Sequence, residues 1–346
     1  MRTTRQDNDR LVNADHSVRF GLFDRPIERI NLLDARPWGL PLPRPLRALR
    51  LKEWQAVQIV HDRYFVIIAL FNAKSVGLVQ VKIYDREERR KYMYERKVAP
   101  WSFRPADQLL DSRCAYEGAG ARVAFTNRLA HDELALDVDI AATKDTPALR
   151  IALTAQTAGQ TPMVVSIPFA TTHGMYSHKG VVPVQGTLQV GDAPAATLAP
   201  GNACMMLDDH KGYYPWTMVW DWVTAGRWVD GELCGFNLTR NASIDPVMHN
   251  ENAFWRGGRL HQLPAVRFER DEGSSPETWR IRDDAGLVDV RFRVEMDGRV
   301  ELNLLVVESR YRGPFGHFEG TLRSLDGEEL CVDGYFGMGE AFFLRM

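Results

Sequence analysis

Asp208, Asp209 and His210 are adjacent in the sequence, and a carboxylate beside an imidazole can act as a general acid–base pair. If this segment is a strand, Asp208 and His210 face one side and Asp209 faces the other, because successive side chains alternate. At most one of the two aspartates then shares a face with the histidine. The alternative interpretation is an acid that caps backbone groups at a strand end, beside a histidine whose hydrogen bonds are satisfied.

Aromatic residues crowd the segment that follows. Four of the nine tryptophans fall between Trp216 and Trp228. Trp220 and Trp222 would share one strand face, with Asp221 on the opposite face. Tryptophan faces stabilise cations, so such a wall favours a carbocation-like transition state, and an acid among aromatic rings is costly to ionise. The alternative for any one of these tryptophans is ordinary core packing.

A third polar group, Asn250-Glu251-Asn252, stands just before Phe254-Trp255. Amide and carboxylate groups can orient a water molecule or accept hydrogen bonds from a substrate hydroxyl. A polar loop is the alternative.

The remaining motifs argue against metals and nucleotide cofactors. His173 and His178 would lie on opposite faces of a strand, and no His-x-His or His-Glu-x-x-His spacing occurs. The glycine-rich stretch 334–339 is followed by no helical pattern, so it predicts a strand and turn rather than a phosphate-binding loop. The sequence also lacks the Gly-x-Ser-x-Gly elbow of serine hydrolases.

The bulk composition bounds the class of protein. The 346 residues carry 43 lysines and arginines against 45 acidic residues, so the total charge gives no electrostatic footprint for nucleic acid or an anionic membrane. Residues 1–15 are polar and no apolar run is long enough to span a membrane, which predicts a protein without signal peptide or integral membrane segment. Four scattered cysteines predict reduced thiols and a cytoplasmic location.

The hydrophobic pattern has a period of two. Residues 134–140 and 288–294 alternate apolar and polar side chains, as half-buried strands do. Turn signals such as Asp297-Gly298 and Asp326-Gly327 recur between such runs and indicate hairpins. The charged segment 85–97 is either a short helix or a polar hairpin.

Many hairpin-linked strands in a chain of this length predict an all-β protein with two antiparallel β-barrels packed in tandem. We expect an irregular lead-in over residues 1–45, a first β-domain over 46–195 and a second over 196–346. The last boundary falls in the Ala/Pro/Gly-rich stretch 191–202.

The chain resembles the carotenoid 1,2-hydratase and kievitone hydratase group and its AttH-like bacterial relatives. The matching residues are Tyr176-Ser177, Pro183-Val184-Gln185-Gly186, Asp209-His210-Lys211-Gly212 and Trp220-Asp221-Trp222. It is similar over nearly its whole length to an uncharacterised bacterial branch catalogued only as a domain of unknown function. The landmarks of that branch are Gly21–Asp24, Lys52–Gln55, Asp209–Trp216, Gly235–Leu238, Asn250–Asn252 and Phe336–Glu340.

The resemblance implies two lipocalin-like barrels with a hydrophobic cavity. It also implies cofactor-free hydratase, lyase or isomerase chemistry on terpenoid or polyketide-like molecules. In the hydratases a tryptophan usually precedes the glycine of the Asp-His motif, whereas here Gly212 follows Lys211 directly.

The first functional hypothesis is therefore an acid–base enzyme acting on a lipophilic alkene. Asp209 or Asp208 would protonate the alkene, His210 would position that acid, and Glu251 would hold the reacting water together with its amide neighbours. The residues expected to bind substrate are Tyr176, Lys211, Tyr214, Trp216, Trp220, Trp222, Asn237, Asn250, Asn252 and Trp255. The second hypothesis is a lipocalin-like carrier of a hydrophobic small molecule that performs no chemistry. The oligomeric state is left open.

Overall fold

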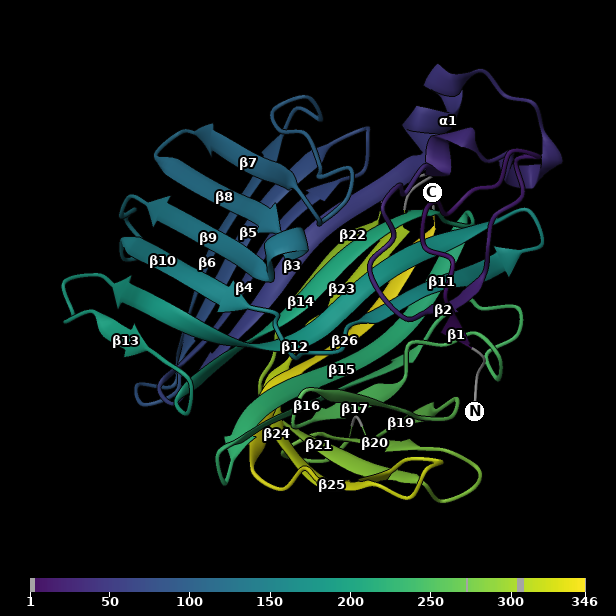
Figure 1. Ribbon diagram of the computed structural model, residues 1–346. Helices are drawn as coiled ribbons and strands as arrows, with labels where there is room; N and C mark the ends of the chain where they lie inside the picture. Colours follow the sequence, from purple (N-terminus) through teal and green to yellow (C-terminus); the bar gives the residue numbers. More distant parts are fainter. Residues whose placement is uncertain (1–3, 272, 304–307, 346) are drawn as a thin grey trace.

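The computed structural model describes residues 4–271, 273–303 and 308–345. The described chain is nearly all β, with one short helix, α1 (Arg44–Arg50), and three 3-10 turns at Leu32–Asp34, Pro37–Gly39 and Leu129–His131. The strands form two curled antiparallel sheets, each a half-barrel (Figure 1). This confirms the prediction of an all-β protein built from two lipocalin-like units.

The first sheet contains all the described strands up to residue 213. Its main path, in spatial order, is β6 (Arg90–Val98), β5 (Gly77–Asp85), β4 (Tyr64–Asn72), β3 (Leu51–His61), β14 (Ala203–Tyr213), β12 (His173–Val190), β10 (Leu149–Gln156), β9 (Glu133–Ile140), β8 (Ala121–Arg128) and β7 (Ser112–Gly118). Off this path lie β1 (Thr4–Arg5), β2 (Gly21–Phe23), β11 (Met163–Ala170) and β13 (Ala196–Leu198).

The second sheet is built from the C-terminal part of the chain. Its main path is β18 (Arg259–Gln262), β17 (Ala253–Arg256), β16 (Glu232–Arg240), β15 (Thr217–Val229), β26 (Tyr335–Arg345), β24 (Phe315–Arg323), β21 (Val288–Met296), β20 (Thr278–Arg282) and β19 (Arg267–Asp271). The strands β22 (Arg299–Asn303), β23 (Glu308–Arg312) and β25 (Glu329–Cys331) pair beside this path.

The alternation read from the sequence matches the burial of these strands. Leu134, Leu136 and Val138 of β9 are buried, while the residues between them are only partly buried. The charged segment 85–97 is the turn and most of the second strand of the β5–β6 hairpin, so the helical alternative is wrong. Period-two patterning therefore predicts the half-buried strands such as β9, whereas β3 and β4 are buried on both faces.

Apolar side chains gather in three main layers. One cluster fills the concave side of the first sheet and another fills the concave side of the second. The third joins the convex faces of the two sheets, and includes Phe65 and Met206 from the first sheet and Trp222 and Phe336 from the second. This inter-sheet layer also holds the polar side chains described below.

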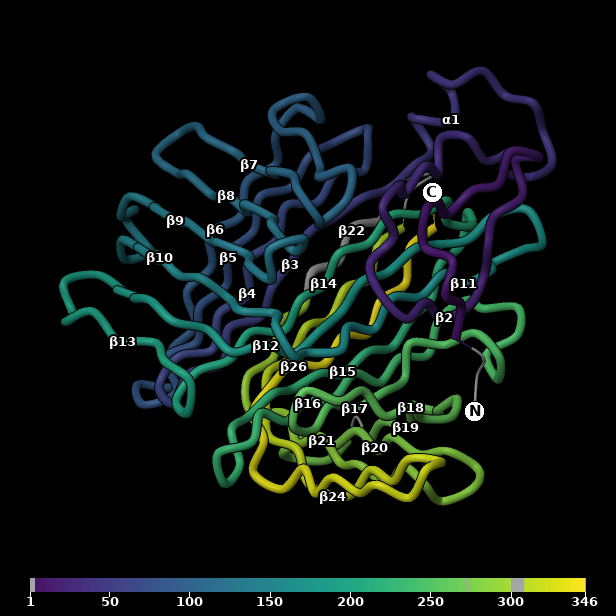
Figure 2. Tube along the Cα trace, viewed as in Figure 1, coloured from purple at the N-terminus to yellow at the C-terminus, as the bar shows by residue number. Residues whose placement is uncertain are grey.

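The chain changes sheets later than the predicted boundary at 195/196. Strand β14 pairs with both β3 and β12, so residues 203–213 belong to the first sheet, and the second sheet begins with β15 at Thr217. β14 and β15 run through the middle of the molecule, where the sheets meet (Figure 2). The division into domains 1–45, 46–195 and 196–346 stays a prediction about folding units, but β14 structurally belongs with the strands before it.

The N-terminal lead-in is irregular, as expected, and packs over one end of the first sheet. Leu11, Phe23 and Leu32 form a small buried cluster with Tyr176 and Tyr213. None of the helices in the described part of the chain is long and apolar enough to cross a membrane.

The two sheets approach closely where Gly226 pairs with Gly235. A methyl carbon at Gly235 would lie 2.7 Å from Val181 Cγ2 of the first sheet and 2.9 Å from the carbonyl oxygen of Ala225. A side chain here would force the sheets apart, since contacts this short do not occur between real atoms.

Gly235→Ala is therefore expected to lower the free energy of unfolding by about 1–3 kcal/mol, the usual cost of overpacking. Urea denaturation followed by tryptophan fluorescence measures this. Gly180→Ala is the matched control, because a methyl group there meets its nearest neighbour at 3.9 Å. Equal losses in both variants would contradict the close-approach explanation.

Candidate functional site

The two faces of β14 carry different polar groups. Asp208 and His210 point toward the second sheet, whereas Asp209 and Lys211 point into the first sheet's concave side. The structure thus pairs His210 with Asp208 and separates it from Asp209.

Asp208 is the centre of a buried hydrogen-bond cluster. Its Oδ1 accepts from Lys179 Nζ at 2.5 Å and lies 3.0 Å from His210 Nε2. The indole nitrogen of Trp54 donates to Oδ2 at 3.3 Å. Burial alone raises the pKa of Asp208, but the cationic Lys179 and the imidazole outweigh it and hold the pKa well below its usual range. Asp208 is therefore an anion at neutral pH.

His210 is surrounded by oxygen atoms on one side and an aromatic ring on another. Its Nε2 lies 3.0 Å from Ser177 Oγ and 3.5 Å from Glu251 Oε1. The Trp54 ring stacks on the imidazole with centroids 4.5 Å apart. Its other ring nitrogen, Nδ1, is buried and has no hydrogen-bond partner among the described residues. With Nε2–H directed at Asp208, Nδ1 keeps a lone pair that can accept a proton.

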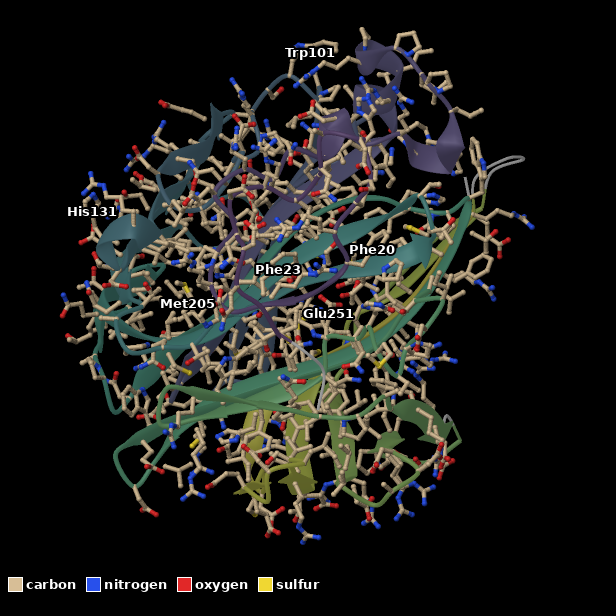
Figure 3. The ribbon with its side chains drawn as sticks, turned by 45° about the vertical axis from the view of Figure 1, so that its right-hand side comes forward. Phe20, Phe23, Trp101, His131, Met205 and Glu251 are labelled. Atoms are coloured by element: carbon tan, nitrogen blue, oxygen red, sulfur yellow. The ribbon has the colours of Figure 1, made fainter. Side chains whose placement is uncertain are left out.

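The second sheet supplies the opposite wall. The Trp222 indole donates to Asn237 Oδ1 at 2.6 Å, and Asn237 Nδ2 donates to the carbonyl oxygen of Glu251 at 2.6 Å. Lys179 Nζ lies 4.7 Å from the centroid of the Trp222 ring. Glu251 lies at the middle of the molecule, where the two sheets meet (Figure 3).

Asn250 and Asn252 hold the segment that carries Glu251. Asn250 Nδ2 donates to the carbonyl oxygen of Pro246 at 2.8 Å, and Asn252 accepts from the backbone N–H of Thr239 at 2.6 Å. Both amides therefore hydrogen-bond the backbone and position Glu251 in a buried loop.

Glu340 is a member of this layer to which the sequence gave no role. Glu340 lies on β26, where it pairs in register with Trp222 of β15. It also hydrogen-bonds Trp220. Burial raises the pKa of Glu340 to about 7, against the lowering effect of Lys82. Lys82 is itself buried, which lowers its pKa to about 8. The signal in the sequence is an acid in the otherwise apolar segment 336–344.

A continuous line of rings borders the cluster. We call it the aromatic row: Phe71, Trp54, Tyr214, Trp220, Phe342 and Tyr311, with successive ring centroids 4.3 to 6.5 Å apart. All of these except Tyr214 are partly exposed, so the row reaches the surface between the sheets. It offers an apolar, polarisable wall next to His210 and Glu340.

The enclosed space beside Lys179 is small. A cavity of about 10 Å³ is lined by Lys179, Gln58, Trp222 and Asn237, among others. It has room for about one water molecule. Gln58 Oε1 is buried without a hydrogen-bond partner in the described chain, so it can accept from that water. The cavity is too small for a larger molecule.

Comparison with protein families agrees with the resemblance to a domain of unknown function. The model of a family described as a domain of unknown function, DUF2804, matches residues 2–345. The chain belongs to this family. Kievitone hydratase from Nectria haematococca is similar in structure, with a TM-score of 0.48 and 11% identity over 85% of this chain and 88% of that chain. A likeness of this degree assigns no reaction to the DUF2804 chain, and the comparison with curated proteins gives no match.

Several residues expected at the site lie elsewhere in this DUF2804 chain. Trp216 is 61% exposed and stacks against Arg50. Tyr176 packs beneath the N-terminal segment. Trp255 lines the water-sized cavity, but its indole donates to the carbonyl oxygen of Thr161.

Asp209 and Lys211 form a second polar group inside the first sheet. Asp209 Oδ1 lies 3.6 Å from Lys211 Nζ, and burial raises the pKa of Asp209 against the opposing effect of Lys211. His178 faces Asp209 across the β12–β14 pair, and burial lowers its pKa to about 4. These residues are separated from the tryptophans of the second sheet by the sheet itself.

The pKa of His178 predicts loss of stability in acid. Because the folded-state pKa lies below the unfolded value of 6.5, the stabilisation is complete above about pH 6.5 and is lost as pH falls toward 4. The total is about 3 kcal/mol. Urea denaturation at about pH 7 and pH 4 should show a smaller pH-dependent loss for His178→Gln than for the wild type.

The exposed His131 supplies the control for this measurement. His131→Gln should keep the wild-type pH dependence. If His178→Gln loses as much stability on acidification as the wild type does, the titration of His178 is not the cause.

Proposed function

We propose that this protein is a cofactor-independent acid–base enzyme that acts on a lipophilic, alkene-containing molecule between the two sheets. The reaction would add or remove water or move the double bond. The observation that carries the proposal is the convergence of a carboxyl group with a pKa near 7, Glu340, and the Asp208–His210 pair on one aromatic row. Paired groups whose environments push their pKa values apart are the usual basis of acid–base catalysis.

Glu340 takes the role of the acid in this proposal. Its pKa of about 7 keeps much of it protonated at neutral pH, whereas Asp208 is ionised through its contacts with Lys179 and His210. Asp209 faces the other side of β14 and cannot reach the aromatic row. The acid assigned from sequence to Asp208 or Asp209 therefore moves to β26.

Trp220 would stabilise the positive charge that follows protonation. Glu340 gives its proton to one alkene carbon, and the resulting cation lies against the face of Trp220 in the aromatic row. Trp222 has the ammonium group of Lys179 over its ring and lines the water-sized cavity, so its face is not open to the substrate cation.

His210 would complete the reaction as the base. A water molecule forms a bond to the cationic carbon and loses a proton to Nδ1, while Asp208 fixes the tautomer and stabilises the imidazolium. Loss of a carbon-bound proton to the same nitrogen would give the isomer instead. Net addition gives one hydrogen and one hydroxyl to the double bond, and dehydration is the reverse.

The buried groups also separate this function from that of a carrier. A carrier needs one or two orienting polar groups, whereas an acid catalyst needs a proton source and a partner together. Here the buried Asp208, His210, Lys179 and Glu251 occupy one layer with the partly buried Glu340, and holding this much charge between two sheets is costly without a chemical role.

Incubation with the probe geraniol in D₂O tests the proposal. Mass spectrometry should detect deuterium at an alkene carbon or a hydrated product with the wild-type protein. His210→Ala should lower the rate by at least about 10²-fold. His131 is an exposed histidine at the far edge of the first sheet (Figure 3). His131→Ala should leave the reaction rate unchanged. A panel of terpenoid alkenes could quench the tryptophan fluorescence while none of them incorporates deuterium. That result would contradict the enzyme and favour a carrier.

A further inference from the structure

The residues around α1 combine basic charge with exposed apolar side chains. Residues 35–52 contain Arg36, Arg44, Arg47, Arg50 and Lys52 and no acidic residue. The near-balanced total charge of the chain conceals this local excess. Only Arg44 has a carboxylate partner within the described chain, Asp34 at 3.3 Å, and that pair is largely exposed.

Large apolar side chains stand between these arginines. Leu46 and Leu49 are 48% and 57% exposed and lie three residues apart, on one face of α1. Leu40, just before the helix, is 51% exposed. Exposed leucines are common singly, but several beside one another mark a surface that contacts something.

Trp216 extends this surface from the end of β14. The Arg50 guanidinium lies 4.1 Å from the centroid of the Trp216 ring, so the helix and the tryptophan form one continuous patch. We call these residues the α1 patch: Leu40, Leu46, Leu49, Trp216, Arg36, Arg44, Arg47 and Arg50. Trp101, the most exposed of the large apolar residues at 84%, lies at the same end of the molecule (Figure 3).

The electrostatics of the patch call for an anionic occupant. Lys52 is buried next to it, and burial together with the nearby charges of Arg50 and Lys74 lowers its pKa to about 8. Positive groups are thus close enough to disfavour one another's charge. Negative charge placed over the patch would relieve this repulsion.

We infer that the α1 patch docks on an anionic lipid surface. Leucine, tryptophan and arginine side chains mixed on one convex end suit the boundary between lipid headgroups and acyl chains, where rings and arginine stems bury apolar area while charges meet phosphate. Nucleic acid would leave unused the leucines that project from this seven-residue helix. The patch lies at an extremity of the molecule, so a flat surface can reach it (Figure 2).

The position of the patch links it to the inter-sheet site. Trp216 follows Tyr214 of the aromatic row by two residues, so the docked end adjoins the apolar entrance to His210. Apolar molecules dissolved in the lipid would be delivered beside the row. Docking itself does not depend on the proposed reaction.

Co-sedimentation with vesicles tests the inference. The full chain should bind vesicles of phosphatidylglycerol and phosphatidylcholine at about 0.1 M salt and should be released at about 1 M salt, because screening shortens the reach of surface charge. Pure phosphatidylcholine vesicles should bind much less. Each arginine near the surface contributes about fivefold in affinity, so the double variant Arg36→Glu/Arg44→Glu should lose at least about 25-fold.

Matched variants separate the apolar part of the surface. Leu46→Asp/Leu49→Asp should lose at least about tenfold in vesicle affinity with an unchanged circular dichroism spectrum. Val247→Asp is the control, because Val247 is 71% exposed on a loop of the second sheet. No binding of the wild type to anionic vesicles would overturn the inference. Self-association that depends on Leu46 and Leu49 would also overturn it, by showing that a second copy covers the patch.

Discussion

Asp208→Asn is expected to lower the free energy of unfolding by about 3–5 kcal/mol. Lys179 Nζ lies 2.5 Å from Asp208 in a site where both side chains are more than nine-tenths buried. Removing the carboxylate leaves a buried ammonium group without its counter-charge, and the imidazole of His210 loses its nearest anion as well. Urea denaturation at about pH 7 gives the size of the loss.

Two controls isolate the ion pair. The double variant Lys179→Met/Asp208→Asn removes both charges and should recover much of the lost stability, since the penalty belongs to the unpaired charge. Asp139→Asn breaks an exposed pair with Arg150 at 3.9 Å and should cost less than about 0.5 kcal/mol. A small effect of Asp208→Asn, equal to that of Asp139→Asn, would mean that water reaches the inter-sheet layer freely.

Glu340→Gln is expected to lower the rate of deuterium incorporation into the geraniol probe by about 10²–10⁴-fold, the range for loss of a general acid. In the wild type the rate should fall about tenfold per pH unit above pH 7, because Glu340 loses its proton there. The amide cannot donate an acidic proton at any pH, so this alkaline fall should disappear in the variant. Measuring the rate from about pH 5 to pH 9 checks both effects.

Glu319→Gln serves as the control for this prediction. Glu319 is a partly exposed carboxylate of β24 in the same sheet, paired with Arg291 at 3.4 Å, and its loss should leave the pH profile unchanged. A profile in Glu340→Gln that keeps the wild-type shape would contradict the assignment of the acid. Loss of activity in His210→Ala alone would then place the proton source on the first sheet.

Much of the fold was readable from local patterns. Strands such as β9 and β21 have strict period-two alternation, and their burial follows that pattern. The turn at residues 86–89 joins two strands, which the charged composition alone did not distinguish from a helix. Periodicity reports which face of an element is buried, but it contains no information on what that face packs against.

The candidate site was partly predictable for the same reason. Alternation in a strand predicted that only one aspartate could share a face with His210, and that aspartate is Asp208. Trp222 and Glu251 were named from sequence and lie in the same layer. Trp216 was named with them and lies on the surface, because the chain leaves the first sheet just before it.

By itself, the sequence determined the all-β class and the two-faced character of the strand around Asp208, because alternation depends only on neighbouring residues. Only the tertiary structure decided that the pKa of Asp208 is lowered and the pKa of Glu340 is raised. Lys179 comes to Asp208 from β12, and Glu340 comes from β26 at the other end of the chain. The pKa of a carboxyl group depends on burial and on charges within a few ångströms, and these distances arise only when two sheets pack face to face.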